Sequence, residues 1–233
     1  MKWLKFSLIL NLLLIPVAVI YVVKKLQFYT DMKKDAEQHA YQKKNPNSYW
    51  KAREEIYDVM PGKQNSIVFM GNSLVDNCDW SELFDKPIIN RGLAGDTMDG
   101  MLRRVDQVIK FKPTKIFLLA CANDLPGNYT NLDTIYNKYK RLVARIKSGD
   151  PQCKIHIISE LPRSDFAPAS RLVVPLNKKL VQLSKEENTA FINVYDNLAS
   201  NDGRLNRSFS YDGLHMNGEG YMVMKKVIEP YVN

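Results

Sequence analysis

Three residues of this chain have the types that serine-based acyl transfer requires, and they lie in two segments far apart in the sequence. Ser73 follows Gly71 and Asn72 directly after a short apolar run, so its hydroxyl is expected on a tight turn. Asp212 and His215 are three residues apart, which lets the carboxylate meet imidazole Nδ1 and leaves Nε2 facing outward. A serine nucleophile needs such a base and a group that orients it. Taken alone, either segment can also be a turn with a helix cap.

Acyl transfer also requires hydrogen-bond donors for the oxyanion that develops on the carbonyl group. Gly95, in a loop that leads into a predicted helix, can offer its backbone N–H, and Asn123 can offer its side-chain amide. The backbone N–H of Ser73 is a natural third donor, although a structural loop hydrogen bond is the alternative for Asn123. The other two histidines are not expected to act, because His39 lies in a polar N-terminal segment and His156 in a predicted core strand.

The elements that position these residues alternate between short apolar runs and longer amphipathic stretches. Five runs are too short for helices and are rich in Ile, Val and Phe: Ile67–Met70, Pro87–Asn90, Lys115–Ala120, Lys154–Ser159 and Ala190–Val194. Four stretches between and after them have helical spacing: Thr97–Lys110, Asn131–Ser148, Ser170–Glu187 and Asn217–Tyr231. This alternation predicts parallel strands with helices on both faces, a three-layer α/β/α sandwich. Chemistry gathers at the carboxyl ends of such strands, and Ser73, Gly95 and Asn123 all follow predicted strands.

With these residues in this order, the chain resembles the SGNH (GDSL-type) hydrolase family, whose blocks carry Ser, Gly, Asn and His. Gly71–Ser73 resembles the first block, with Asn where the commoner form has Asp, and Asn90–Thr97 is similar to the second. Asn123-Asp124 resembles the end of the third block, and Asp212–His215 resembles the Asp-x-x-His block. The resemblance extends over residues 66–231.

The resemblance implies a five-stranded parallel sheet of flavodoxin-like order. It also implies a role for each candidate residue: Ser73 is the nucleophile, His215 is general base and then acid, and Asp212 orients His215. The N–H groups of Ser73 and Gly95 and the amide of Asn123 form the oxyanion hole. No cofactor and no metal ion are expected.

The chain departs from the family pattern at Cys121, where the third block usually has Gly. A side chain there could narrow the pocket or alter the loop that carries Asn123. Cys121 is not expected to be a nucleophile, because no second His is positioned to serve it. Cys78 lies near Ser73 in the sequence, and a buried, inert thiol is the expectation there over a reactive one.

The activity implied by the resemblance is hydrolysis of small carboxylic esters through an acyl-enzyme. The expected substrates carry short-chain or O-acetyl groups on carbohydrates or lysophospholipid-like molecules. One alternative is O-acyl transfer to cell-surface glycans, and a less favoured one is a non-catalytic glycan-binding domain. The acyl length, the alcohol and the oligomeric state are left open.

Composition excludes several other classes of protein. The 233 residues are 45% hydrophobic and 25% charged, as in folded domains, and three Cys do not make a disulfide framework. The net charge of +8 would suggest nucleic-acid binding if the basic residues lay on the folded domain. Residues 1–53 hold ten basic and three acidic residues, whereas the remainder holds 23 basic and 22 acidic residues. The near-neutral remainder implies no basic face, so nucleic acid is not an expected partner.

The N-terminal segment has the features of a membrane anchor. Phe6–Val23 is an uncharged 18-residue run, which as a helix is about 27 Å long, close to the roughly 30 Å of a bilayer core. Lysines bracket the run on both sides: Lys2, Lys5, Lys24 and Lys25. No small-x-small cleavage site follows, so an anchor is favoured over a cleaved signal peptide or a buried helix. The expected organisation is an anchor (1–25), a polar stalk (26–60) and an extracytoplasmic hydrolase domain (61–233), which is secreted if the anchor is cleaved.

Overall fold

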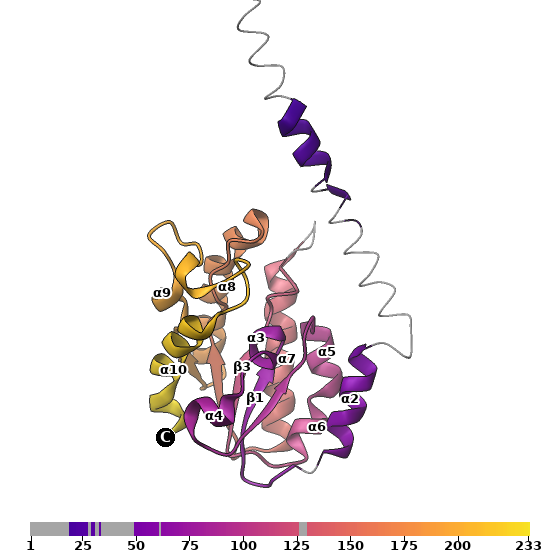
Figure 1. The fold of residues 1–233 in the computed structure, drawn as a ribbon. Coiled ribbons are helices and arrows are strands. Elements are labelled where there is room, and N and C mark those ends of the chain that lie inside the picture. The colour runs from indigo at the N-terminus through magenta and orange to yellow at the C-terminus, as the bar shows by residue number, and fades with distance from the viewer. Residues whose placement is uncertain (1–18, 28, 31–32, 34–48, 61, 126–129) are drawn as a thin grey trace, which may run out of the picture. The chain divides into compact units, whose positions relative to one another are not determined.

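The computed structural model describes residues 19–27, 29–30, 33, 49–60, 62–125 and 130–233 (Figure 1). The chain divides into two compact units, Met1–Ala52 and Arg53–Asn233. In the first unit, residues 19–27 form a helix with exposed side chains. Within the described part of the chain, no helix has both the length and the apolar character needed to cross a bilayer. Residues 1–18 of the predicted anchor and 34–48 of the predicted stalk, including His39, lie outside the described residues.

The second unit is built on a parallel sheet of five strands, which confirms the predicted fold class. The strands are β1 (Ile67–Gly71), β2 (Ile88–Gly92), β3 (Lys115–Leu119), β4 (Lys154–Ile158) and β5 (Ala190–Ile192). Their order is β2-β1-β3-β4-β5, which is the flavodoxin-like order. Each neighbouring pair is parallel, and Gly71 at the end of β1 lies opposite Gly92 at the end of β2.

Helices cover both faces of the sheet and make a three-layer structure (Figure 1). One face carries α5 (Met98–Arg104), α6 (Asp106–Ile109), α7 (Leu132–Gly149) and α8 (Ala167–Glu186). The other carries α3 (Ser73–Asp76), α4 (Trp80–Phe84), α9 (Tyr195–Leu198) and α10 (Gly218–Val232). Alternate residues of the strands point to opposite faces, so Val68 and Met70 join one hydrophobic cluster while Phe69 joins the other. Both faces are buried, as the continuous apolar runs predict.

The long helices occupy the predicted stretches, but several short elements were not predicted. Helices α3, α4 and α9 and the 3₁₀ turn η1 (Arg207–Phe209) have three to five residues each. Elements this short do not complete the periodicity on which the prediction rests. The stretch predicted as one helix over Thr97–Lys110 is divided between α5 and α6, which meet at Val105.

Helix α2 (Tyr49–Val59) falls in the predicted polar stalk, and from Arg53 onward it belongs to the second unit. It lies beside α5 and α6 (Figure 1). Tyr57 is 2% exposed, and its hydroxyl donates a hydrogen bond to the carbonyl of Gly92. The guanidinium of Arg91 lies between two aromatic rings, 4.8 Å from the centroid of Tyr57 and 5.4 Å from that of Phe111. These cation–π contacts attach the end of α2 to β2.

A buried ion pair joins the carboxyl ends of β1 and β2 to the loop that follows β2. Arg104 Nε lies 2.7 Å from Asp96 Oδ2, and the two side chains are 1% and 5% exposed. The other guanidinium nitrogens donate to the carbonyls of Arg91 (2.8 Å) and Gly71 (2.9 Å). The fork geometry of Arg thus satisfies three acceptors at the ends of two strands.

Replacing Arg104 with Met should lower the free energy of unfolding by roughly 3–5 kcal/mol, because the Asp96 carboxylate stays buried without its partner. Urea denaturation followed by tryptophan fluorescence measures the loss, since Trp80 is fully buried in the core. Arg145→Met is the matched control, because Arg145 forms an exposed pair with Asp106 and should change little. Equal losses in the two variants would contradict this account of the buried pair.

Candidate active site

Ser73 is the first residue of α3, directly after β1 ends at Gly71. Asn72 caps the helix, and its Oδ1 accepts from the N–H of Leu74 at 3.0 Å. At the other end of α3, the carbonyl of Val75 accepts from the indole N–H of Trp80 at 2.8 Å. This four-residue helix is therefore fixed at both ends, and Ser73 is 7% exposed. The tight turn expected at Gly71-Asn72-Ser73 therefore has both features: Asn72 caps a helix, and Ser73 lies at the edge of the sheet.

The structure brings Ser73, His215 and Asp212 into one hydrogen-bonded series. Ser73 Oγ lies 2.9 Å from His215 Nε2, and His215 Nδ1 lies 2.6 Å from Asp212 Oδ2. The other carboxylate oxygen of Asp212 accepts from the backbone N–H groups of Leu214 (2.9 Å) and His215 (2.7 Å). Partial burial raises the pKa of Asp212, but the hydrogen bonds from His215 and Leu214 outweigh it, so the net pKa lies below the usual value. Asp212 is thus held ionised beside the imidazole.

A glycine lets the segment of Asp212 and His215 approach the loop that follows β4. Gly213 has φ +86°, and its carbonyl accepts from the N–H of Ser164 at 2.7 Å. A Cβ at this position would lie 2.9 Å from the backbone nitrogen of Asp165. Both the backbone conformation and this close approach therefore require Gly between the two functional residues.

Gly95 lies in a β-turn between β2 and α5. The N–H of Asp96 donates to the carbonyl of Leu93 at 3.0 Å, and Gly95 occupies the third position of the turn with φ +76°. A positive φ at that position is typical of a type II turn and favours Gly. The N–H of Leu93 donates in turn to the carbonyl of Gly71 at 3.0 Å, so this turn lies beside the residues that precede Ser73.

Asn123 contacts the same turn from the loop that follows β3. Its Nδ2 donates to the carbonyl of Asp96 at 2.9 Å, which leaves one amide hydrogen for another acceptor. Among the residues that the structure describes, the backbone N–H groups of Ser73 and Gly95 have no hydrogen-bond partner. The three predicted oxyanion donors therefore come from the ends of three adjacent strands, β1, β2 and β3.

Two acidic groups lie in or near the loop that carries Asn123: Asp124 is half-buried and follows Asn123 directly, and Glu160 is buried in the segment after β4. Desolvation raises the pKa of Asp124 to about 6, although the N–H of Met98 donates to its carboxylate. Complete burial raises the pKa of Glu160 to about 8, partly offset by the charge of Arg163. Both groups raise the pKa of the Cys121 thiol, which burial already holds well above its usual value. Cys121 is therefore a protonated, buried thiol, as expected for a residue that is not a nucleophile.

The remaining candidate residues also lie where the sequence suggests. Cys78 is buried, and desolvation raises the pKa of its thiol to about 12, so it is inert. His156 lies in β4, stacked on Phe117 with ring centroids 4.5 Å apart, and burial lowers its pKa to about 4. It is a neutral core residue. Among the described residues, no three His, Cys, Asp or Glu side chains are grouped so that they could hold a metal ion.

Several residues that hold the site together give no signal in the sequence. Arg104 and Asp96 were not singled out, and neither was Asp76, whose carboxylate accepts from the N–H of Ala94 at 3.1 Å. Each of these contacts joins residues that are distant in the sequence, so no local spacing indicates them. Tyr211 was also missed, although it lies four residues before His215; its ring stacks on the imidazole with centroids 6.0 Å apart.

Comparisons with known proteins identify the family and the fold of the chain. The family model of the GDSL-like lipase/acylhydrolase family matches residues 69–223. A structure of a protein from Bacteroides fragilis, named as an acylhydrolase, has a TM-score of 0.69 and 26% identity, covering 77% of this chain and 93% of that one. An acetylxylan esterase from Geobacillus stearothermophilus has the same fold, with a TM-score of 0.62 and 16% identity, covering 74% and 95%.

One curated relative is longer than this chain and matches it over only part of its own length. The chain is 27% identical over 175 residues to an N-acylneuraminate cytidylyltransferase of Escherichia coli. The aligned region is 72% of this chain and 40% of the relative. The chain therefore spans less than half the length of that protein.

The conformation of Cys121 gives a test of backbone strain at the site. Cys121 has φ +91°, in the region that favours Gly, and such strain costs about 1–3 kcal/mol. Cys121→Ala keeps the strain and loses the buried sulfur, whereas Cys121→Gly removes the strain. We expect the Gly variant to be more stable than the Ala variant by about 1 kcal/mol in urea denaturation. An Ala variant as stable as the Gly variant would show that no strain is stored there.

Proposed function

The chain belongs to the GDSL-like lipase/acylhydrolase family and is a carboxylic ester hydrolase, and from this premise we propose that it acts through an acyl-enzyme on Ser73. The observation that carries this proposal is the continuous series of hydrogen bonds from Ser73 through His215 to Asp212. A hydroxyl beside an imidazole whose other nitrogen faces a carboxylate is the arrangement that activates serine as a nucleophile.

The proposed reaction has two halves. Ser73 Oγ attacks the ester carbonyl while its proton passes to His215 Nε2, and Asp212 stabilises the imidazolium. The ester C–O bond then breaks, and His215 returns the proton to the leaving alkoxide. A water molecule attacks the acyl-enzyme, gives a proton to His215, and releases the carboxylic acid as Ser73 regains its proton.

The proposed oxyanion hole consists of the N–H groups of Ser73 and Gly95 and the side-chain amide of Asn123. Two observations support it: neither backbone N–H has a partner among the described residues, and Asn123 is hydrogen-bonded to the turn that contains Gly95. Donors fixed before the reaction stabilise the developing charge without reorganisation, which is why such sites accelerate acyl transfer.

Ser73→Ala should lower the turnover of p-nitrophenyl acetate by a factor on the order of 10⁶, because no other group can form the acyl-enzyme. A fluorophosphonate probe should label the wild-type chain at Ser73 and leave this variant unlabelled, with the site read by mass spectrometry. Ser148→Ala, at an exposed position in α7, is the matched control and should keep full activity and labelling. Intact turnover in Ser73→Ala, or a wild-type chain that is not labelled, would refute the mechanism.

For the substrate, we propose short-chain esters, O-acetyl groups above all, on an alcohol that presents a flat face, such as a sugar ring. Tyr211 supports this proposal, because the residue is 71% exposed and its ring lies nearly parallel to the imidazole of His215, at an interplanar angle of 14°. We propose that the exposed part of this ring contacts the alcohol part of the ester. Lysophospholipid-like esters are the alternative substrates in this proposal.

Tyr211→Ala should raise KM for acetylated sugars by about 3–10-fold, the loss of roughly 1 kcal/mol of ring contact, while KM for vinyl acetate stays the same. The sugar panel should include an O-acetylated N-acylneuraminate, the sugar in the name of the E. coli relative. Tyr211→Phe is the control, since it keeps the ring and loses only the hydroxyl. An equal change in KM for vinyl acetate would show that Tyr211 acts only through His215.

Acyl transfer to a glycan hydroxyl remains the alternative outcome for the acyl-enzyme, with the sugar oxygen in place of water. Adding glycan acceptors to the same assay separates the two, because transfer yields an acylated glycan and hydrolysis yields free acid.

We also propose that residues 1–25 anchor the chain in a membrane with the hydrolase domain outside the cytoplasm. The anchor is proposed from the uncharged run Phe6–Val23 between lysines. Because lysines flank both ends, the orientation is proposed from the short tail before the run, which usually stays in the cytoplasm.

A further inference from the structure

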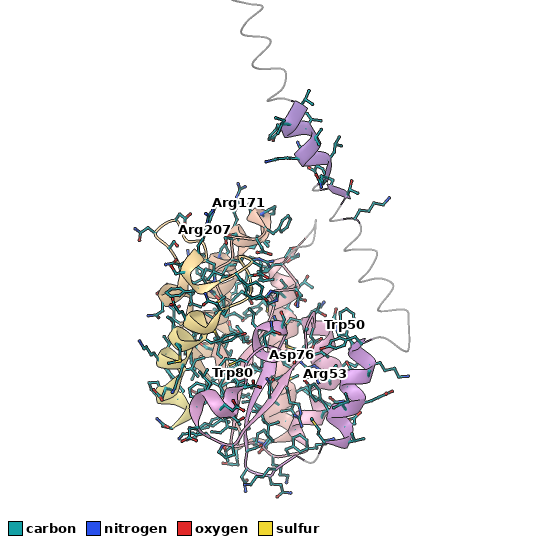
Figure 2. All side chains as sticks on the ribbon, viewed as in Figure 1. Trp50, Arg53, Asp76, Trp80, Arg171 and Arg207 are labelled. Carbon is teal, nitrogen blue, oxygen red and sulfur yellow. The ribbon has the colours of Figure 1, made fainter. Side chains whose placement is uncertain are left out.

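Helix α2 is connected to the proposed oxyanion hole by a series of polar contacts. Arg53 Nη2 lies 3.1 Å from Asp76 Oδ1, and Asp76 Oδ2 accepts from the N–H of Ala94 at 3.1 Å. Ala94 is the residue before Gly95 in the turn described above. Figure 2 shows Arg53 and Asp76 side by side, the first on α2 and the second at the end of α3. The two oxygens of one carboxylate thus join a helix on one side to the oxyanion turn on the other.

Asp76 also belongs to the same four-residue helix as Ser73. The N–H of Asp76 donates to the carbonyl of Asn72 at 2.9 Å, and this bond closes the turn that contains Ser73. The helix lies very close to β2: a Cβ on Gly92 would be 2.1 Å from the backbone nitrogen of Asp76. One end of α3 therefore holds Ser73, and the other holds the turn of Gly95.

The Arg53–Asp76 pair is largely shielded from water, with side-chain exposures of 29% and 14%. Arg53 Nη2 lies 2.9 Å from the hydroxyl of Tyr57, which itself donates to the carbonyl of Gly92. Helix α2 therefore contacts the segment from Gly92 to Ala94 twice, once through Tyr57 and once through Asp76. A partly buried, hydrogen-bonded charge pair holds its partners more firmly than the exposed pairs elsewhere on the surface.

We propose that Asp76 and Arg53 are positioning residues for the oxyanion hole, acting through the N–H of Ala94 to fix the direction of the Gly95 N–H. This inference rests on the proposed function of Ser73. It places part of the catalytic apparatus on α2, outside residues 69–223 that the family model matches. Neither side chain is proposed to touch the substrate.

The test compares kcat and KM for p-nitrophenyl acetate in variants of the full chain, with functional sites counted by fluorophosphonate labelling. Asp76→Ala should lower kcat per labelled site by about 30–100-fold. One oxyanion donor contributes a factor of about 10²–10³ to kcat, and a misaligned donor loses much of that factor. KM should stay within about 2-fold, since substrate binding does not use these groups. Arg53→Ala, which leaves the bond from Ala94 in place, should lower kcat by about 3–10-fold, and Arg53→Lys should restore most of it.

Glu54→Ala is the matched control, because Glu54 lies on the same helix and pairs with Arg103, away from the turn. It should leave kcat per labelled site unchanged. A merely structural role for Asp76 would lower the melting temperature and the number of labelled sites while kcat per site stayed at the wild-type value, and that result would overturn the inference.

The two proposals fail in different ways. If the wild-type chain hydrolyses the ester, Ser73→Ala does not, and Asp76→Ala keeps its kcat per site, then the positioning role alone is wrong. If the wild-type chain is not labelled at Ser73, the proposed mechanism is wrong and the positioning role falls with it.

Discussion

The ion pair between Arg104 and Asp96 is the interaction on which the carboxyl edge of the sheet depends. Arg104 donates to the carbonyls of Gly71 and Arg91, where β1 and β2 end, and to the carboxylate of Asp96 in the following loop. The carbonyl of Asp96 then accepts from Asn123, which follows β3. A buried charge pair is tolerable only when its polar atoms are satisfied, so any shift of one strand end relative to another would be costly. This requirement fixes the positions of the strand ends relative to one another.

The segment that carries His215 is organised differently. Its hydrogen bonds are local: Asp212 accepts from the N–H groups of Leu214 and His215 and from the imidazole itself. It contacts the rest of the edge through the bond between His215 and Ser73 and through Gly213 and the loop after β4. Ser73 and the proposed oxyanion donors are thus held by contacts among the strand ends and the elements packed on them, whereas the proposed base is held mainly by its own turn. Such a turn can be read from four consecutive residues, which is why the Asp-x-x-His segment is informative in the sequence.

The sequence therefore predicted what depends on local patterns. Apolar runs predicted the strands, and their Gly-rich continuations predicted where Ser73 and Gly95 lie. The structure places Ser73 Oγ 2.9 Å from His215 Nε2. The catalytic roles of these residues stay predictions. It did not predict α2, because Arg53 and Tyr57 lie in a polar segment and gain partners only in the folded chain. The pair of Arg53 and Asp76 joins residues 23 positions apart, and no periodicity records such a contact.

These contacts also bear on where the catalytic unit begins. Residues that resemble the family blocks supply the groups that would contact an ester. The direction of a backbone N–H, however, is set by the residues that contact and support its peptide group. For Gly95 that support includes Asp76, Arg53 and the bond from Tyr57 to Gly92, and two of these three side chains precede residue 61. An oxyanion donor is effective only when it is oriented before the charge develops. On the proposed role of Gly95, the functional unit would begin within α2, at Arg53, where the compact unit also begins.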